Sequence, residues 1–187
     1  MIITEQKPVQ EIEDNVKKYK NVFIIGCGDC CAVCRTGGTE EVKALIEKFK
    51  EDGINIEKSI VIQAPCDQRV SKRDLQRVQE DIDAADALLV MACGLGVQSI
   101  ARLTGKKIIP GNNTKFMGIV YGMGSTEEVC IGCDNCVLLE TGTCPVVLRK
   151  VCEDCGRINQ YDAKVCDQCK SENLEESKEP RKFVFRA

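Results

Sequence analysis

The first half of the chain alternates short apolar runs with longer segments in which apolar residues recur every three or four positions. The apolar runs are NVFIIG (21–26), SIVIQAP (59–65), ALLVMA (87–92) and KKIIP (106–110). Short, nearly continuous apolar runs are typical of parallel strands that are buried on both faces. We therefore predict four strands of one parallel sheet.

The intervening segments have the periodicity of amphipathic helices, and they cover 8–20, 39–53, 71–86 and 97–105. Thr39 and Ser71 stand where helix-capping residues are favoured, and Gly53 follows the last turn of its helix. Strands and helices that alternate at this spacing predict an α/β fold, an open parallel sheet wrapped by helices.

The pattern changes near residue 125, where apolar runs shorten and cysteines become frequent. We predict an α/β domain over 1–124, a ferredoxin-like iron–sulfur segment over 125–150, a zinc ribbon over 151–172, and a charged linker and tail over 173–187. The apolar FVF at 183–185 fits either a docked strand or a frayed tail.

Composition narrows the chemistry. Of 187 residues, 14 are cysteine and none is histidine. The lack of histidine excludes Cys-His and Ser-His catalysis within the chain, and it means that a metal must be held mainly by thiolates. Thiolate ligands favour zinc or iron–sulfur clusters. No carboxylate pair is marked out for acid–base chemistry, so we assign no catalytic residue.

Charge and hydropathy bear on location and partners. The net charge is −3, with Lys and Arg scattered among acidic residues, so the sequence offers no basic face for nucleic acid. We find no signal-peptide pattern and no apolar stretch of transmembrane length. We therefore expect a cytoplasmic protein that has reduced thiols and no membrane partner.

A first group of cysteines directly follows the predicted strands. Its members are Cys27, Cys30, Cys31, Cys34, Cys66 and Cys93. The carboxyl ends of parallel strands share one edge of the sheet, where ligands bind, so these thiols can meet in space. We predict that this edge holds a four-iron (4Fe–4S) cluster.

Two alternatives remain for this first group, and a third is excluded. Cys66 and Cys93 fit buried apolar residues as well, and Cys27 with Cys30 fits a redox dithiol. Dinucleotide binding through the nearby glycines is excluded, because the third glycine of G-x-G-x-x-G would fall at Cys31 or at Ser99.

A second group follows the ferredoxin pattern. Cys130, Cys133 and Cys136 are spaced C-x2-C-x2-C, and Cys144 precedes Pro145. This spacing predicts a second four-iron cluster, although the gap before Cys144 is longer than in bacterial ferredoxins. Zinc is the alternative metal.

A third group has the spacing C-x2-C, ten residues, C-x2-C. Its members are Cys152, Cys155, Cys166 and Cys169. Two such knuckles offer a tetrahedral set of thiolates, which predicts a zinc ribbon, with a single iron as the alternative. Gly156 stands where the first knuckle requires a positive φ, and Lys170 holds the equivalent place in the second. A module this small needs its metal to fold.

Four stretches in this order resemble one known family. They are VFIIGCGDCCAVCRTGG, APCDQR, VMACGLGVQS and CIGCDNCVLLETGTCPV, within about residues 8–148. Together they resemble the small iron–sulfur subunit of acetogen-type methylenetetrahydrofolate reductase. Cys31 and the cysteines of 152–169 depart from that family's pattern.

The resemblance implies an electron-transfer subunit of a hetero-oligomer in one-carbon metabolism, the Wood–Ljungdahl pathway of acetogenesis. The partner would be a flavin-binding TIM-barrel reductase subunit, and the electron donor would be ferredoxin or another carrier. The flavin would belong to the partner. The family's cysteines fall on Cys27, Cys30, Cys34, Cys66 and Cys93, and on Cys130, Cys133, Cys136 and Cys144. The first set has five members for four coordination positions.

Other classes of function remain open from the sequence. One is a zinc or iron–sulfur adaptor that serves another flavoprotein or a methyl-transfer complex. Another is a thiol redox enzyme or a corrinoid-linked methyl-transfer component. Metal content distinguishes the first of these from an electron-transfer subunit, and turnover by the isolated chain distinguishes the second.

Overall fold

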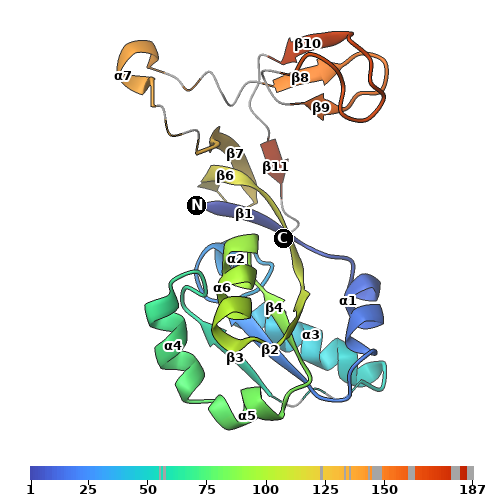
Figure 1. The fold of residues 1–187 in the computed structure, drawn as a ribbon, viewed down its shortest axis with the longest axis vertical. Helices are drawn as coiled ribbons and strands as arrows, with labels where there is room; N and C mark the ends of the chain where they lie inside the picture. The colour runs from blue at the N-terminus through green and yellow to red at the C-terminus, as the bar shows by residue number, and fades with distance from the viewer. Residues whose placement is uncertain are drawn as a thin grey trace. The chain divides into compact units, whose positions relative to one another are not determined.

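The structure is a computed structural model that describes residues 1–54, 56, 58–122, 124–132, 134, 136–142, 144, 149–159, 163–177 and 182–184 (Figure 1). The chain divides into two compact units. The first unit is Ile2–Lys115, and the second is Phe116–Ala187 with Met1.

A parallel sheet forms the centre of the first unit. Its strands are β2 (Val22–Cys27), β3 (Ser59–Ile62), β4 (Ala87–Met91) and β5 (Lys107–Pro110), in the order β3-β2-β4-β5. All three neighbouring pairs are parallel, which confirms the predicted parallel sheet. All five residues of β4 are buried, which explains its uninterrupted apolar sequence.

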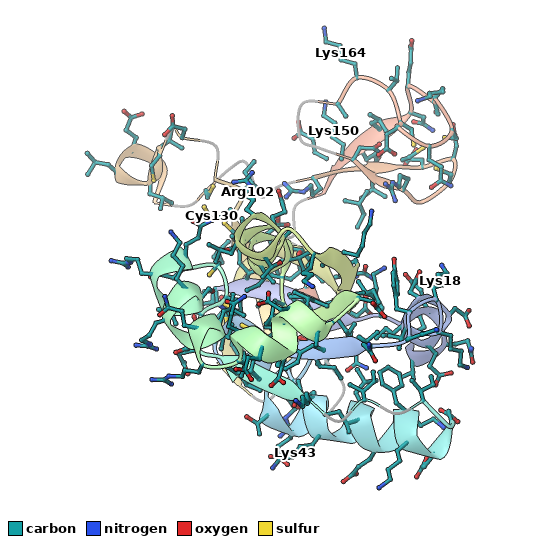
Figure 2. The ribbon with its side chains drawn as sticks, turned by 60° about the horizontal axis from the view of Figure 1, so that its bottom comes forward. Lys18, Lys43, Arg102, Cys130, Lys150 and Lys164 are labelled. Carbon is teal, nitrogen blue, oxygen red and sulfur yellow. The ribbon has the colours of Figure 1, made fainter. Side chains whose placement is uncertain are left out.

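Helices cover both faces of this sheet (Figure 1). They are α1 (Val9–Val16), α3 (Thr39–Glu51), α4 (Gln68–Gln76), α5 (Gln79–Ala84) and α6 (Gly94–Thr104), with the short α2 (Cys30–Val33) after β2. Helices α1 and α3 pack on the face that carries Ile24 and Leu89, and α4, α5 and α6 pack on the face that carries Ile25 and Leu88. Lys43 of α3 points away from the sheet (Figure 2).

Two predicted helix starts differ from the structure. Helix α3 begins at Thr39 rather than after it, because the Gly38 amide donates to the Glu41 carboxylate at 2.9 Å and completes the first turn. The segment predicted as one helix over 71–86 is two helices, α4 and α5, and the cap of α4 is Asp67, whose side chain accepts from the Arg69 amide.

The second unit contains two small antiparallel groups of strands. β6 (Asn112–Gly122) begins in the first unit and pairs in the second with β7 (Ser125–Cys130), which also pairs with β11 (Lys182–Val184). These strands belong to a sheet of order β1-β6-β7-β11, in which β1 (Ile2–Gln6) is a strand that we did not predict. The short helix α7 (Leu138–Thr141) follows β7.

The remaining strands are β8 (Arg149–Cys152), β9 (Ile158–Asn159) and β10 (Leu174–Ser177), in the antiparallel order β10-β8-β9. Strand β10 lies within the segment that the sequence assigned to a charged linker. Phe183 and Val184 lie in β11, where the Thr126 hydroxyl donates to the Phe183 carbonyl at 2.7 Å, so this part of FVF is a docked strand. Phe185 lies outside the described residues.

Candidate metal centres

The parallel sheet brings thiols of the first group to its carboxyl edge. Cys27 is the last residue of β2, Cys66 follows β3, and Cys93 precedes α6 after β4. Because β2 lies between β3 and β4, the ends of these three strands are neighbours. Cys30 is the first residue of α2, three positions after Cys27. We call Cys27, Cys30, Cys66 and Cys93 the sheet-edge cysteines.

Local contacts fix the turn that carries Cys66. The buried Ser71 hydroxyl donates to the Pro65 carbonyl at 3.0 Å, which ties α4 to this turn. On the other side, a Cβ placed on Gly96 would lie 3.3 Å from the Pro65 Cβ, so glycine lets α6 approach closely. Ser71 therefore orients a candidate ligand rather than capping its helix as we predicted.

The electrostatics of the sheet-edge cysteines indicates that these thiols are near enough to affect one another's ionisation. Burial raises the pKa of Cys66, and the neighbouring Cys93 and Cys27 thiolates raise it further. Burial also raises the pKa of Cys30, with contributions from Asp29, Cys27 and Cys93. Thiolates that repel one another in a partly buried site favour a bound cation, because its charge relieves the repulsion.

These four thiols differ in exposure. Cys27 and Cys93 are buried, Cys30 is half-buried and Cys66 is exposed. A group bound by all four would thus be attached to the protein core on one side and would reach the surface on the other.

Cys34 and Cys31 have other surroundings. Both are fully buried, and the Cys34 thiol lies 3.8 Å from the Ile2 carbonyl oxygen, to which it donates. The Cys31 thiol beside Cys27 is the main cause that lowers the pKa of Cys27 to about 6, and the Cys27 thiol in turn raises the pKa of Cys31. Apart from the presence of an extra cysteine, no pattern in the sequence predicts this arrangement.

The second group is described only in part. Cys130 and Cys136 are exposed, Cys144 is half-buried, and Cys133 lies outside the described residues. Figure 2 labels Cys130 at the end of β7. The Gly132 amide points toward the Cys130 sulfur at 3.4 Å, and Gly132 has a φ of +67°. The assignment of a cluster to this group stays a prediction from its spacing.

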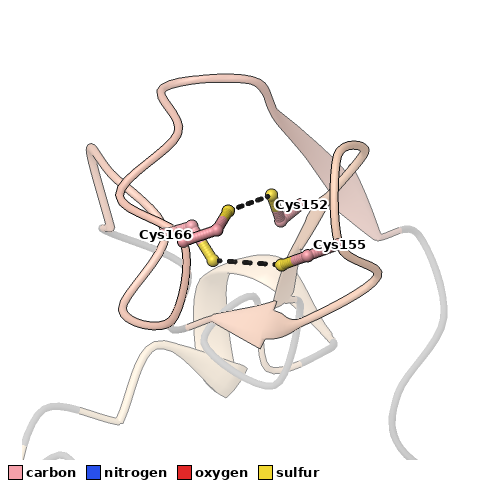
Figure 3. A group of neighbouring side chains, drawn as sticks. Cys152, Cys155 and Cys166 are labelled. Carbon is pink, nitrogen blue, oxygen red and sulfur yellow. Dashed lines mark hydrogen bonds between the residues drawn. The ribbon is translucent and has the colours of Figure 1, made fainter.

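The third group forms a compact site (Figure 3). The sulfur atoms of Cys152, Cys155, Cys166 and Cys169 all lie within 4.8 Å of one another, so the site can hold a metal ion. Cys152 and Cys169 are 3.5 Å apart, and Cys155 and Cys166 are 3.6 Å apart. In the part of the chain that the structure describes, no other three potential ligands come this close. We call this group the four-cysteine site.

Two equivalent turns build the four-cysteine site. The Gly156 amide donates to the Cys152 carbonyl at 2.8 Å, and the Lys170 amide donates to the Cys166 carbonyl at 3.0 Å. Gly156 has a φ of +71° and Lys170 a φ of +62°, so both turns have the predicted positive φ, and Lys170 adopts it without being glycine.

The thiols of this site also have altered acidity. Burial opposes ionisation of Cys166, but amide donors from Cys169 and Gln168 outweigh it and lower the pKa of Cys166 to about 6. An amide donor from Arg157 favours the Cys155 thiolate, yet the thiol of Cys169 and burial outweigh it and raise the pKa of Cys155 to about 12. A metal ion that binds such a group of thiols displaces their protons, because thiolates are the metal-binding form.

Comparison with known proteins adds no assignment: no family model, no curated protein and no solved structure matches this chain. Within the described residues, none of the helices has the length and apolar character that crossing a membrane requires. The fold and the two groups of thiols therefore define a mixed α/β protein with a cysteine site that can bind metal.

Proposed function

We propose that this chain is an electron-transfer subunit that carries two four-iron clusters and one zinc ion. It would pass electrons from ferredoxin or another carrier to the flavin of a partner subunit. The observation that carries the proposal is the gathering of the four sheet-edge cysteines, from three neighbouring parallel strands, in a chain without histidine.

The sheet-edge cysteines fit a four-iron cluster. Four cysteines supply its usual ligand set, and each binds a different iron, so their sulfurs stand farther apart than around a single ion. This agrees with the finding that only the four-cysteine site has its sulfurs within single-ion distance among the described residues. Such a cluster supplies one-electron chemistry, and the exposure of Cys66 gives it a path to a partner.

Cys34 is the surplus cysteine in this proposal. The resemblance offered five candidates for four positions, and the Cys34 thiol is fully buried against the Ile2 carbonyl. We therefore assign Cys27, Cys30, Cys66 and Cys93 as the ligands. The second cluster would use Cys130, Cys133, Cys136 and Cys144.

The four-cysteine site fits zinc in a structural role. Four thiolates on two tight turns supply the tetrahedral set that structural zinc prefers. A closed set of four protein ligands leaves no open position for a substrate, so we place this site outside the electron path.

The partner in the proposal follows from the resemblance given above. In a methylenetetrahydrofolate reductase complex, the reduction of methylene-tetrahydrofolate would take place at the flavin of a TIM-barrel subunit. This chain, which has no histidine, would contribute electrons and no acid–base group.

Metal analysis of anaerobically purified protein tests the proposal. We expect about eight irons and about eight acid-labile sulfides per chain, from two four-iron clusters, and about one zinc. Reduced protein should give an electron paramagnetic resonance (EPR) signal and should reduce the flavin of a methylenetetrahydrofolate reductase barrel subunit. Zinc without iron would contradict the proposal and favour an adaptor role.

Two variants make the test specific to the sheet edge. Cys66→Ala should lose about four irons, because a cluster is left with three ligands. Cys34→Ala, the matched control, should keep all of them. If Cys34→Ala lost iron and Cys66→Ala kept it, Cys34 would be the ligand in place of Cys66. The proposed electron-transfer role would not change.

A further inference from the structure

Helix α4 presents a group of basic side chains next to the turn that carries Cys66. Four basic residues of α4 and of its C-terminal end are exposed: Arg69, Lys72, Arg73 and Arg77. Each lies three or four positions from another member of the group, so all four share one side of the helix. The buried residues of α4 are Ser71, Asp74 and Leu75. We call the four basic residues the basic face.

The acidic side chains of the same segment are much less exposed. The Arg69 side chain is 90% exposed, whereas that of its partner Asp67 is 29% exposed. The Arg73 side chain is 62% exposed, whereas that of its partner Asp74 is 10% exposed. The surface of α4 therefore presents positive charge to the solvent, although the net charge of the whole chain is −3.

An exposed apolar side chain lies on the other side of the Cys66 turn. Helix α6 lies beside α4 (Figure 1), and a Cβ placed on Gly96 would lie 3.8 Å from the Cys66 amide nitrogen. Leu95, in the same turn of α6, is 58% exposed. The sequence has no Asp or Glu over 87–126, which includes all of α6. The exposed acid Asp29 belongs to the α2 side of the edge, so the positive charge lies on the α4 side.

We propose that the basic face and Leu95 form the docking surface for a small acidic electron-carrier protein, which reduces the sheet-edge cluster beside Cys66. The inference rests on the proposed function, since it takes Cys66 as a cluster ligand. One electron leaves the reduced carrier and arrives on the oxidised cluster, and no bond forms or breaks. The carrier leaves in its oxidised form.

The size and charge of this surface fit a transient redox partner. Opposite charges speed the encounter of two proteins and orient them, and complexes for electron transfer bury little surface. Four charges and one apolar side chain suit such a short encounter. A flavoprotein subunit that stays bound needs a larger interface, and a nucleic acid needs a wider basic surface and gains nothing from Leu95.

The test measures how fast an acidic carrier reduces the full chain. The probe is reduced flavodoxin, a small acidic protein that becomes a coloured semiquinone when it gives up one electron. Anaerobic stopped-flow mixing with the oxidised chain gives the second-order rate constant. We expect it to fall steeply as salt is raised from about 0.05 M to about 0.5 M, because salt screens the attraction. Cys66→Ala, which should lack the cluster, should lose this fast reduction.

Charge reversal on the basic face makes the test specific. Arg69→Glu combined with Lys72→Glu should keep the iron of the wild-type protein and lower the rate constant at low salt by about tenfold or more. The same two residues changed to Gln should give a smaller loss, and this variant serves if the Glu variant does not fold. The end point with dithionite, a small reductant, should be the same in all variants.

Helix α3 offers a matched control on the opposite face of the sheet. Lys43 and Lys50 are exposed residues of α3, and changing both to Glu alters the net charge of the chain by the same amount. This variant should lower the rate constant by less than about twofold, because distant charges are screened. Leu95→Gln should raise the carrier concentration that gives half of the maximal rate, by up to about fivefold.

The outcomes separate the inference from the proposed function. Wild-type protein without iron would refute both. With iron present, an unchanged rate constant in the Arg69 and Lys72 variant, or an equal loss in the α3 control, would overturn the inference alone. Normal reduction by flavodoxin with failure to reduce the flavin of the barrel subunit would assign the basic face to that subunit instead. Binding of a single-stranded oligonucleotide that charge reversal abolishes would assign it to nucleic acid, and either result would overturn the inference.

Discussion

The sheet-edge cysteines and the four-cysteine site are built in opposite ways. The first are attached to the ends of buried strands and depend on a large apolar core for their positions. The second are carried by two tight turns between short strands, where Cys152 and Cys166 are buried and Cys155 and Cys169 are exposed.

The two regions also differ in which side chains are buried. In the first unit, aliphatic and aromatic side chains from strands and helices fill both faces of the sheet. Over 149–159 and 163–177, the described residues that are buried are Arg149, Cys152, Asn159 and Cys166. None of these is aliphatic or aromatic, and two belong to the four-cysteine site. The sheet should therefore hold its thiols whether or not a cluster is bound, whereas we expect the four-cysteine site to fold only around a metal ion.

Removal of the metal from the four-cysteine site should have the largest effect. We expect Cys155→Ser to abolish protection of backbone amides over 149–177 and to leave the strands β2 and β4 protected. The physical reason is that metal binding contributes about 10–16 kcal/mol in zinc modules of this size, which no apolar core here replaces. Hydrogen exchange followed by mass spectrometry measures both regions in one sample.

The corresponding experiment at the sheet edge replaces one of the proposed cluster ligands. Cys66→Ala should remove iron and leave amide protection in β2 and β4 close to that of the wild-type protein. If β2 and β4 lost their protection as fully as the four-cysteine site does in Cys155→Ser, the two sites would depend on metal equally and the contrast would be wrong.

A substitution in the apolar core of the first unit should give the next largest effect on stability. Leu89 is fully buried at the centre of β4 and packs with α1 and α3. Leu89→Ala should lower the free energy of unfolding of the first unit by about 2–5 kcal/mol, through lost apolar contact and the cavity that remains. Denaturant unfolding followed by hydrogen exchange measures it.

The four-cysteine site should not respond to this change. Its zinc content and amide protection should match the wild-type protein, since Leu89 and the four-cysteine site belong to different compact units. As a control of similar chemistry, Ile158→Ala removes a side chain of β9 that is 48% exposed, and it should change stability by less than about 0.5 kcal/mol.

The sequence predicts the sheet well because its signal is local. Uninterrupted apolar runs such as ALLVMA mark buried parallel strands, and residues that follow such strands must share an edge. The placement of Cys27, Cys66 and Cys93 follows from these two facts. Strand β1 escapes prediction because its sequence, IITEQ, is short and mixed, and it is held by partners far along the chain.

The surroundings of Cys31 and Cys34 could not be predicted for a similar reason. The contact between Thr4 and Thr36 joins residues 32 positions apart, and that between Thr36 and Asn112 joins residues 76 positions apart. Hydroxyl and amide contacts of this kind leave no periodic pattern. The spacing C-x2-C, in contrast, predicts its own turn geometry, which the φ values of Gly156 and Lys170 confirm.

Those two residues allow the smallest and most local test of the comparison. Lys170 has a φ of +62°, a conformation that costs a residue with a side chain about 1 kcal/mol relative to glycine. Lys170→Gly should therefore make the metal-bound four-cysteine site more stable by up to about 1 kcal/mol, less the greater freedom of glycine in the unfolded chain. The concentration of chelator that removes half of the zinc should rise.

Gly156→Ala is the mirror experiment in the other turn. An added Cβ would meet no atom of the described residues within 4 Å, so backbone strain at a φ of +71° is the only cost, again about 1 kcal/mol. The concentration of chelator that removes half of the zinc should then fall. The iron content of the sheet edge should not change in Lys170→Gly or in Gly156→Ala. A loss of iron in Gly156→Ala would mean that the clusters depend on an intact four-cysteine site. It would contradict the expectation that the two sites are independent.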